Sequence, residues 1–391
     1  MSDMQGSVVV IGSGHAGMSL VKEIRSQNKE ISIILISKDN AASYYKPNIS
    51  KALAMLKTPS DLITSSHNKI SAELNIDVVN NATVHSIDPK TNTLSVEGEN
   101  SSRTIAYQKL VLALGATPIV STINGNAKRN ILSVNNLNDY RIFREELSNK
   151  NRVLIMGAGF VGTEFASDLS ACGYLVDVVD RGKWPLRSSM PFELGKAITE
   201  SFNSTFVKWH FESMVVAANK VKGGINVTLK GGKCLQTDII LSAVGIRPNI
   251  ELAIKAGLAI NHGIIANEKL LTSDKNIYAL GDCAEISGLI LPFINPASNA
   301  ARALANTLLG HNSNVNFKNF TVNVKVPSCP TVISPSLVGR GRWTVKGKSQ
   351  DWAARHTDAN GNLIGFALTG KYLSSKNDFL QECISSTEIV A

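Results

Sequence analysis

Residues 8–17 read "VVVIGSGHAG", and this stretch decides the fold. Its apolar run is typical of a buried strand and leads into Gly12, Gly14 and Gly17 in G-x-G-x-x-G spacing. An amphipathic helix ("MSLVKEIRS") and a second apolar strand ("ISIILIS") complete the unit by residue 37. Gly12 allows the tight turn, Gly14 lets the backbone approach a pyrophosphate, and Gly17 lets helix and strand pack closely. Framed in this way within about thirty residues, the motif predicts a dinucleotide site with the phosphates at the helix amino terminus.

The adenosine end of this first site departs from the usual pattern. The acidic residue that normally ends the second strand is missing, because Ser37 and Lys38 occupy that region and Asp39 comes slightly late. We therefore expect backbone or hydroxyl contacts to the ribose at this point.

Residues 152–181, "RVLIMGAGFVGTEFASDLSACGYLVDVVDR", repeat the whole pattern. Gly157, Gly159 and Gly162 follow an apolar strand and precede a helix, and the next strand ends in Asp180. A carboxylate there binds both ribose hydroxyls and repels a 2′-phosphate, which favours NADH over NADPH. The positive charge of Arg181 would instead attract that phosphate, so this residue weakens the preference for NADH. Two complete units predict that the chain binds two dinucleotides.

Length and composition describe a globular protein of more than one domain. The chain has 391 residues, of which 43% are hydrophobic and 18% charged, so we expect two or three domains. The net charge is +9, which favours an anionic partner. No basic run, zinc-finger spacing or aromatic RNA-binding signature is present, so nucleic acid is not the expected partner.

The cysteines and the hydropathy bear on the compartment. The five cysteines lie far apart, and no pair has redox or metal-site spacing, so we expect buried thiols and no metal. No apolar run is long enough for a membrane helix, and the amino terminus enters a strand at once without a signal peptide. These features favour the cytoplasm. The oligomeric state stays open, with a monomer as the simplest expectation.

Three further motifs indicate which two dinucleotides the chain binds. "LVLALGATP" (110–118) and "IILSAVGIRPN" (239–249) are strands that end in a glycine where the chain leaves one lobe for another. "TSDKNIYALGDCAE" (272–285) places Asp282 directly after Gly281. Together with the glycine motifs, over residues 7 to about 310, these segments resemble the two-dinucleotide-binding flavoprotein reductases. The resemblance implies FAD in the first site, NADH in the second, and Asp282 on the ribityl chain of FAD.

One stretch narrows the resemblance. Disulfide reductases of this superfamily carry redox cysteines where this chain has "SYYKPNISK" (43–51), and no cysteine occurs before Cys172. The stretch is similar to rubredoxin and ferredoxin reductases, in which Lys-Pro lies against the flavin. "GLILPFINPASNAARALANTLLG" (288–310), "VKVPSCPTVISP" (324–335) and "GNLIGFALTG" (361–370) resemble the rubredoxin reductase branch in particular. The resemblance then spans nearly the whole chain and implies an acidic one-electron carrier, rubredoxin, as the partner, with alkane hydroxylation as a family association.

The resemblance also assigns roles to residues. Lys46, near the hydride-accepting nitrogen, would stabilise negative charge on reduced flavin, and Glu164 would be its partner, because a buried lysine is costly unless paired. These two are the predicted catalytic residues. Asn295 and Pro296 are expected as N-cap and first position of a helix whose positive end points at the flavin. Cys283 is expected to pack rather than react, and His15 to contribute only backbone contacts.

The predicted cofactor-binding residues are Gly12, Ser13, Gly14, His15, Ala16, Gly17, Ser37, Lys38, Lys46, Pro47, Val84, Gly115, Gly157, Gly159, Phe160, Val161, Gly162, Glu164, Asp180, Arg181, Gly245, Asp282, Ile294 and Lys325.

Three other functions compete with this interpretation. An NADH oxidase, NADH peroxidase or coenzyme A disulfide reductase would need a cysteine near Lys46. The residue chemistry does not distinguish a ferredoxin reductase from a rubredoxin reductase. A flavin-bearing protein that binds nucleic acid, resembling apoptosis-inducing factor, is compatible with the positive charge but lacks a basic cluster.

The predicted architecture is α/β, with two Rossmann-like domains and a small third domain. The FAD domain is expected at 1–118 and 246–315, the NAD domain at 119–245 and a C-terminal α/β domain at 316–391.

Overall fold

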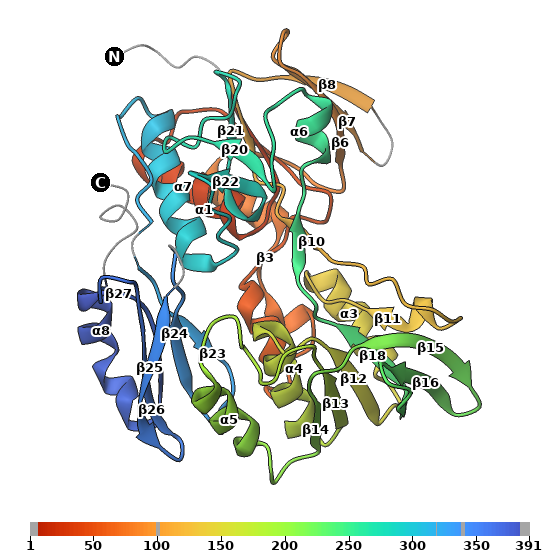
Figure 1. Cartoon of the computed structure of the whole chain (residues 1–391). Coiled ribbons are helices and arrows are strands. Elements are labelled where there is room, and N and C mark those ends of the chain that lie inside the picture. Colours follow the sequence, from red (N-terminus) through yellow and green to blue (C-terminus); the bar gives the residue numbers. More distant parts are fainter. Residues whose placement is uncertain (1–6, 99–101, 318, 338–340, 384–391) are drawn as a thin grey trace. The chain divides into compact units, whose positions relative to one another are not determined.

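The computed structural model describes residues 7–98, 102–317, 319–337 and 341–383. The chain divides into two compact units (Figure 1). Unit 1 comprises Met1–Tyr45, Ile63–Thr117 and Arg247–Phe317, and unit 2 comprises Lys46–Leu62, Pro118–Ile246 and Lys318–Ala391.

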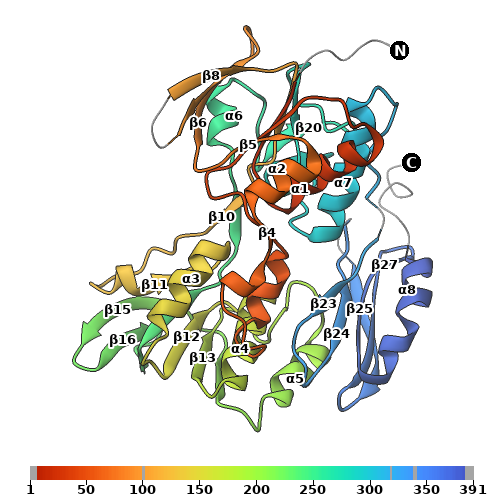
Figure 2. The same ribbon diagram turned by 180° about the vertical axis from the view of Figure 1, so that it is seen from behind.

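Unit 1 is built on a five-stranded parallel sheet with the order β21-β9-β1-β2-β5. Its strands are β1 (Val8–Ile11), β2 (Ile33–Ile36), β5 (Asp77–Val79), β9 (Lys109–Leu112) and β21 (Ile277–Ala279). The central strands are almost entirely buried, as expected for a parallel sheet covered on both faces. Helices α1 (His15–Gln27) and α7 (Ile294–Leu308) lie side by side in both views (Figure 2).

Smaller elements complete unit 1. The meander β6-β7-β8 lies beyond β5, and two short ladders, β3-β4 and β20-β22, extend the unit. Their bounds, with those of the remaining helices, are β3 (Ser43–Tyr44), β4 (Ile63–Ser65), β6 (Thr83–Asp88), β7 (Thr93–Glu97), β8 (Ser102–Ala106), β20 (Ile264–Ala266), β22 (Ala284–Ile286), α2 (His67–Leu74), α6 (Glu251–Lys255) and the 3-10 helix η4 (Gly281–Cys283).

Unit 2 repeats this plan with a parallel sheet in the order β11-β18-β12-β13-β14 and a second meander, β15-β16-β17. The bounds are β11 (Ile131–Leu132), β12 (Arg152–Met156), β13 (Leu175–Val179), β14 (Val207–His210), β15 (Val215–Val221), β16 (Gly224–Leu229), β17 (Cys234–Thr237), β18 (Ile239–Ser242), α3 (Leu137–Glu146), α4 (Phe160–Ala171), α5 (Phe192–Ser201) and η3 (Lys128–Asn130). The repetition gives the two Rossmann-like halves expected from the sequence.

The C-terminal part of unit 2 is an antiparallel sheet with the order β23-β24-β27-β26-β25. It consists of β23 (Val322–Val324), β24 (Thr331–Ser334), β25 (Arg342–Lys348), β26 (Asp351–Thr357) and β27 (Leu363–Thr369), followed by η5 (Gly370–Ser375) and α8 (Lys376–Glu382). Phe366 and Leu368 of the sheet are buried against Phe379 and Leu380 of α8. On β26 and β27 the sheet also contacts α5.

One short segment between two parts of unit 1 in the sequence belongs to unit 2. Residues 46–62, which we call the excursion, contain the 3-10 helices η1 (Lys46–Lys51) and η2 (Ser60–Leu62). The excursion packs on α4 and α3, and its orange turns lie beside α4 in both views (Figures 1 and 2). Strands β10 (Ala116–Pro118) and β19 (Ile246–Pro248) pair with each other where the chain passes between the units.

Within the described part of the chain, no helix combines the length and the apolar character that a membrane crossing requires.

Candidate functional site

The first glycine loop fits a phosphate-bearing ligand. Gly12 has a φ of 114°, and a Cβ there would lie 2.1 Å from the Ala113 carbonyl oxygen. A Cβ at Gly17 would lie 2.0 Å from the Gly12 oxygen, so both positions require glycine. A Cβ at Gly14, in contrast, would meet nothing within 4 Å. Since α1 begins at His15 with no side-chain cap, its first N–H groups face open space at Gly14, where a pyrophosphate can approach.

The turn after β2 brings Asp39 to the first glycine loop. Ser13 Oγ and Ser37 Oγ are 2.6 Å apart, and Ser37 Oγ donates to Asp39 Oδ1 at 2.7 Å. Asp39 also accepts from Ala41 N, which fixes the turn after β2. The contact of Ser37 with a ribose stays a prediction, but Ser37 is buried and joins the Asp39 carboxylate to the first glycine loop. Because the turn folds back, position along the chain alone could not show this.

Asp282 meets the start of α1 within unit 1. A Cβ at Gly281 would lie 2.7 Å from the Ala16 Cβ, so the glycine before Asp282 lets η4 pack directly on α1. His15 Nε2 lies 2.9 Å from Ser298 Oγ in the first turns of α7, and its ring also bonds the backbone of Ile294. Burial lowers the pKa of His15, although Asp282 opposes the effect. His15 therefore ties α1 to α7 through its side chain, a role not expected from the sequence.

Helix α7 begins earlier than predicted. Its first residue is Ile294 and its N-cap is Phe293, so Asn295 and Pro296 are second and third in the helix, not N-cap and first. Proline is tolerated there because the first N–H groups of a helix have no intrahelical partner.

The second glycine loop matches the first. Gly157 has a φ of 100°, and a Cβ at Gly162 would lie 1.9 Å from the Gly157 oxygen. A Cβ at Gly159 would meet nothing within 4 Å. Helix α4 begins after it with Phe160 and exposed Val161, again without a side-chain cap. The amino terminus of α4 is thus the second place where a pyrophosphate fits.

Asp180 is held rigidly at the end of β13. Its Oδ2 accepts from Ala158 N at 2.8 Å and its Oδ1 from Gly182 N at 2.5 Å. The carboxylate is therefore oriented by the glycine loop itself, and each oxygen keeps a free lone pair for a ribose hydroxyl. The side chain of Arg181 is exposed.

Glu164 is buried at a junction of three segments of unit 2. Its Oε2 accepts from Lys325 Nζ at 2.5 Å and from Ser50 Oγ at 2.6 Å, while its Oε1 accepts from Lys325 N at 3.2 Å. The side chains of Glu164 and Lys325 are 6% and 26% exposed, so the pair is largely shielded from water. The lysine that forms the ion pair with Glu164 is therefore Lys325 rather than Lys46. Ser50 was not predicted at all, because nothing in its local sequence marks a serine that will meet a helix more than a hundred residues away.

Lys46 is exposed and lies in the same unit as Glu164. Its Nζ donates to Asn135 Oδ1 at 2.8 Å, just before α3. An exposed lysine needs no buried counter-charge, and this removes the reason for pairing it with Glu164. Its predicted role beside the flavin stays a prediction.

The other predicted residues are distributed over both units. Ala16, Lys38, Val84, Gly115 and Asp282 belong to unit 1, and Pro47 and Gly245 belong to unit 2. Gly115 has a φ of 65° and accepts from Asn249 N, which fixes the end of the "LVLALG" segment.

All five cysteines are free. Cys283 is fully buried, and its Sγ donates to the carbonyl oxygens of Leu112 and Leu280. Burial raises the pKa of its thiol to about 11, so it stays protonated and inert, in line with a packing role.

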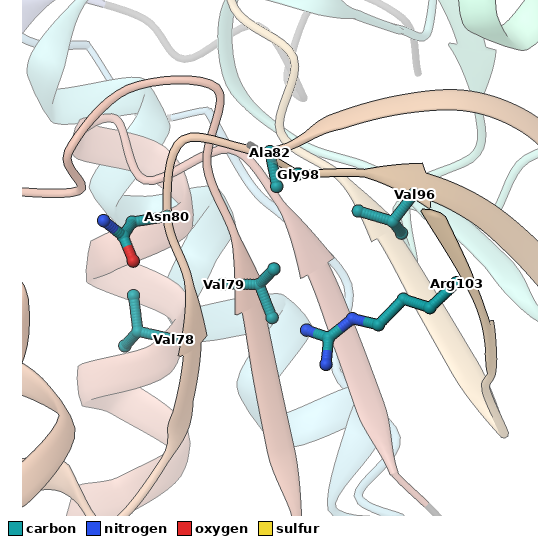
Figure 3. A pocket seen from close by; sticks show the side chains of 7 residues that line it. All are labelled: Val78, Val79, Asn80, Ala82, Val96, Gly98 and Arg103. Carbon is teal, nitrogen blue, oxygen red and sulfur yellow. The ribbon is translucent and has the colours of Figure 1, made fainter. Parts of the chain in front are cut away.

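One pocket of about 290 Å³ lies in unit 1 between the sheet and the meander (Figure 3). The loop at its edge bonds the turn that carries Asp39, because Asn81 N donates to Asp39 O and Ala82 N to Ser37 O. Its volume lies at the lower end of the range of small-molecule sites. It is lined by Val78, Val79, Asn80, Ala82, Val96, Gly98 and Arg103.

Comparison with protein families agrees with this geometry. Residues 6–303 match the family model described as pyridine nucleotide-disulphide oxidoreductase, and the chain belongs to that family of oxidoreductases. Residues 314–383 match a second model, described as rubredoxin binding C-terminal domain. The predicted fold class is thereby confirmed, and so are FAD and NADH, the cofactors of this family, whose phosphates fit the two glycine loops.

Known relatives cover nearly the whole chain. It is 37% identical to the rubredoxin-NAD(+) reductase of Alcanivorax borkumensis over 94% of this chain and 96% of that protein. It is also 37% identical to the rubredoxin-NAD(+) reductase of Acinetobacter baylyi, over 93% and 94%. Among solved structures, the covalent putidaredoxin reductase–putidaredoxin complex is similar with a TM-score of 0.88, at 22% identity, over 97% of this chain and 93% of that one. At that identity the likeness shows the fold alone.

Proposed function

We propose that this protein is a cytoplasmic flavoprotein that oxidises NADH and passes the electrons one at a time to rubredoxin. The observation that carries the proposal is the junction at Glu164. There the helix that starts the second dinucleotide site is bonded to Lys325, which lies in the segment matching a rubredoxin-binding domain. The relatives at 37% identity, named rubredoxin-NAD(+) reductases, support the same partner.

The residues of unit 1 would hold FAD. Backbone N–H groups at the start of α1 bind its pyrophosphate, the cluster of Ser13, Ser37 and Asp39 binds the adenosine ribose, and Asp282 binds the ribityl chain. When bound there, FAD would supply the chemistry that links a two-electron hydride donor to a one-electron acceptor.

The residues of unit 2 would orient NADH. The amino terminus of α4 binds the pyrophosphate, and Asp180 accepts bonds from the ribose hydroxyls. Buried Glu164 neutralises Lys325 and keeps its ammonium group at a fixed place, which a flexible exposed lysine would not have. The exposed charge of Lys46 is held by Asn135 and would stabilise negative charge that builds up during reduction.

Steady-state oxidation of NADH with four acceptors tests the proposal. Rubredoxin, ferredoxin, oxygen and ferricyanide are compared with the same FAD-loaded protein at equal concentrations. We expect the highest kcat/KM with rubredoxin among the protein acceptors. Faster turnover with ferredoxin would overturn the choice of partner, and turnover with oxygen alone would make the protein an oxidase.

A further inference from the structure

A second buried carboxylate lies one helical turn after Glu164. Asp168 of α4 is 4% exposed, and its Oδ2 accepts from Leu53 N at 3.1 Å while its Oδ1 accepts from Ala54 N at 2.8 Å. We propose that Asp168 is a positioning residue for hydride transfer, because it fixes the excursion on α4 and thereby keeps Ser50 on Glu164 and Lys46 on Asn135. The proposal rests on the proposed function of the site.

Spacing along α4 and along the excursion supports this role. Residues 164 and 168 are four apart and face the same side of the helix. Their partners Ser50, Leu53 and Ala54 are three and four apart, within consecutive turns of the excursion. The two carboxylates therefore bind one short stretch of chain at two points, and a shift at Leu53 would move Ser50 as well.

Bonds within the excursion shape this stretch but do not attach it to α4: Leu56 N donates to Leu53 O and Lys57 N to Ala52 O, each at 2.9 Å. Ala52 and Leu53 are buried, but Met55 and Leu56 directly after them are 48% and 88% exposed. The bond from Ala52 N to Ile49 O is 3.4 Å long, which is weak for a helical turn. A second anchor lies farther on, where Arg144 Nη1 donates to Lys57 O at 2.9 Å. Asp168 and Arg144 together thus bracket the exposed residues.

Asp168 is costly to ionise in the folded protein. Burial raises the pKa of its carboxyl, and the amides of Ala54 and Leu53 and the charge of Arg144 offset this only in part. A buried group that is costly to ionise is retained where geometry needs it. An ionised carboxylate accepts the two N–H bonds on two separate oxygens, whereas an asparagine has only one accepting oxygen.

The test compares Asp168→Asn with Asp177→Asn in the FAD-loaded protein. Leu53 N and Ala54 N bond different oxygens of Asp168, so in asparagine the NH2 group would face one of these two amides. Asp177 of β13 bonds His210 of β14, so its substitution removes a carboxylate hydrogen bond elsewhere in the same unit and serves as the control. Amide hydrogen exchange of peptides covering residues 46–62 and the rate of flavin reduction by NADH in stopped flow are measured for each.

In Asp168→Asn we expect exchange at residues 52–57 to accelerate about tenfold and the reduction rate to fall severalfold, with FAD content and KM for NADH unchanged. In Asp177→Asn both quantities should match the wild type. Arg144→Met, a milder change, should also accelerate exchange near Lys57. Unchanged exchange in Asp168→Asn, or faster exchange with an unchanged reduction rate, would overturn the proposal. Because neither readout involves rubredoxin, a failure of the proposed acceptor would show separately.

Discussion

At the scale of single residues, Asp180 should decide the coenzyme. Its carboxylate is fixed by two backbone amides, and in its proposed role at the adenosine ribose it should repel a 2′-phosphate. We expect at least a tenfold preference for NADH in kcat/KM, or about 1.4 kcal/mol. Asp180→Ser should reduce this preference, because exposed Arg181 can then attract a 2′-phosphate without repulsion from the Asp180 carboxylate. Equal efficiency of both coenzymes in the wild type would mean that Arg181 dominates.

The predicted role of Lys46 in flavin reduction can be tested by removing its charge. In Lys46→Met the flavin should remain bound, since its phosphates and ribityl chain have other partners, while reduction by NADH slows roughly tenfold. Lys51→Met, which removes the same charge from the same 3-10 helix, is the control and should reduce normally. Stopped-flow reduction at saturating NADH measures both. A wild-type rate for Lys46→Met would refute the role assigned to this lysine.

At the scale of elements, the glycine loop before α1 offers two contrasting substitutions. An added Cβ at Gly14 meets open space, whereas one at Gly17 meets the Gly12 oxygen at 2.0 Å. Gly14→Ala should therefore fold with near-normal stability but bind FAD weakly, because the methyl group occupies the approach of the pyrophosphate. Gly17→Ala should lower the free energy of unfolding by about 2 kcal/mol or more, through strained packing of helix on strand. Thermal unfolding and FAD titration separate the two; equal stability of both variants would contradict the packing.

Helix α4 should leave a signature in the pH dependence of stability. The folded state raises the pKa of Asp168, so this group stabilises the fold most below the ordinary carboxyl pKa of about 3.9, and the contribution is lost as pH rises through the raised pKa. Arg144, Tyr140 and Cys172 also face this carboxyl. Relative to Asp168→Asn, the wild type should therefore lose unfolding free energy as the pH rises above about 4. Urea unfolding across this range measures the difference, and a constant difference would speak against the shift.

What could be predicted from the sequence follows the range of the contacts. The glycine loops and their flanking strands are local patterns, and the structure forms them within a residue or two of the expected positions. Glu164 could be singled out, but its partner Lys325 lies 161 positions away, and no local pattern chooses between two lysines. The burial predicted for Lys46 was also wrong, since this lysine is exposed. The start of α7 was missed because Asn-Pro is compatible with more than one position in a first turn.

At the scale of the whole molecule, the net charge of +9 should govern encounter with an acidic partner. Opposite charges speed association, and exposed charges are screened over roughly 8 Å at physiological ionic strength. Turnover with subsaturating rubredoxin should therefore fall as salt rises, while reduction of the flavin by NADH should change much less. Both half-reactions are measured between low and high salt. If the rate with rubredoxin does not change with salt, the positive charge does not serve this encounter. Nucleic acid would then again be a candidate partner.

The excursion also determines how this protein can recombine with its relatives. A chimera that exchanges the second dinucleotide-binding half, with joints in β10 and β19, would leave residues 46–62 behind. Ser50, Leu53 and Ala54 would then face a foreign α4, and any mismatch at positions 164 and 168 would leave a buried carboxylate or a backbone amide without its partner. The unit that can be exchanged is thus discontinuous, and residues 46–62 must be inherited together with α4.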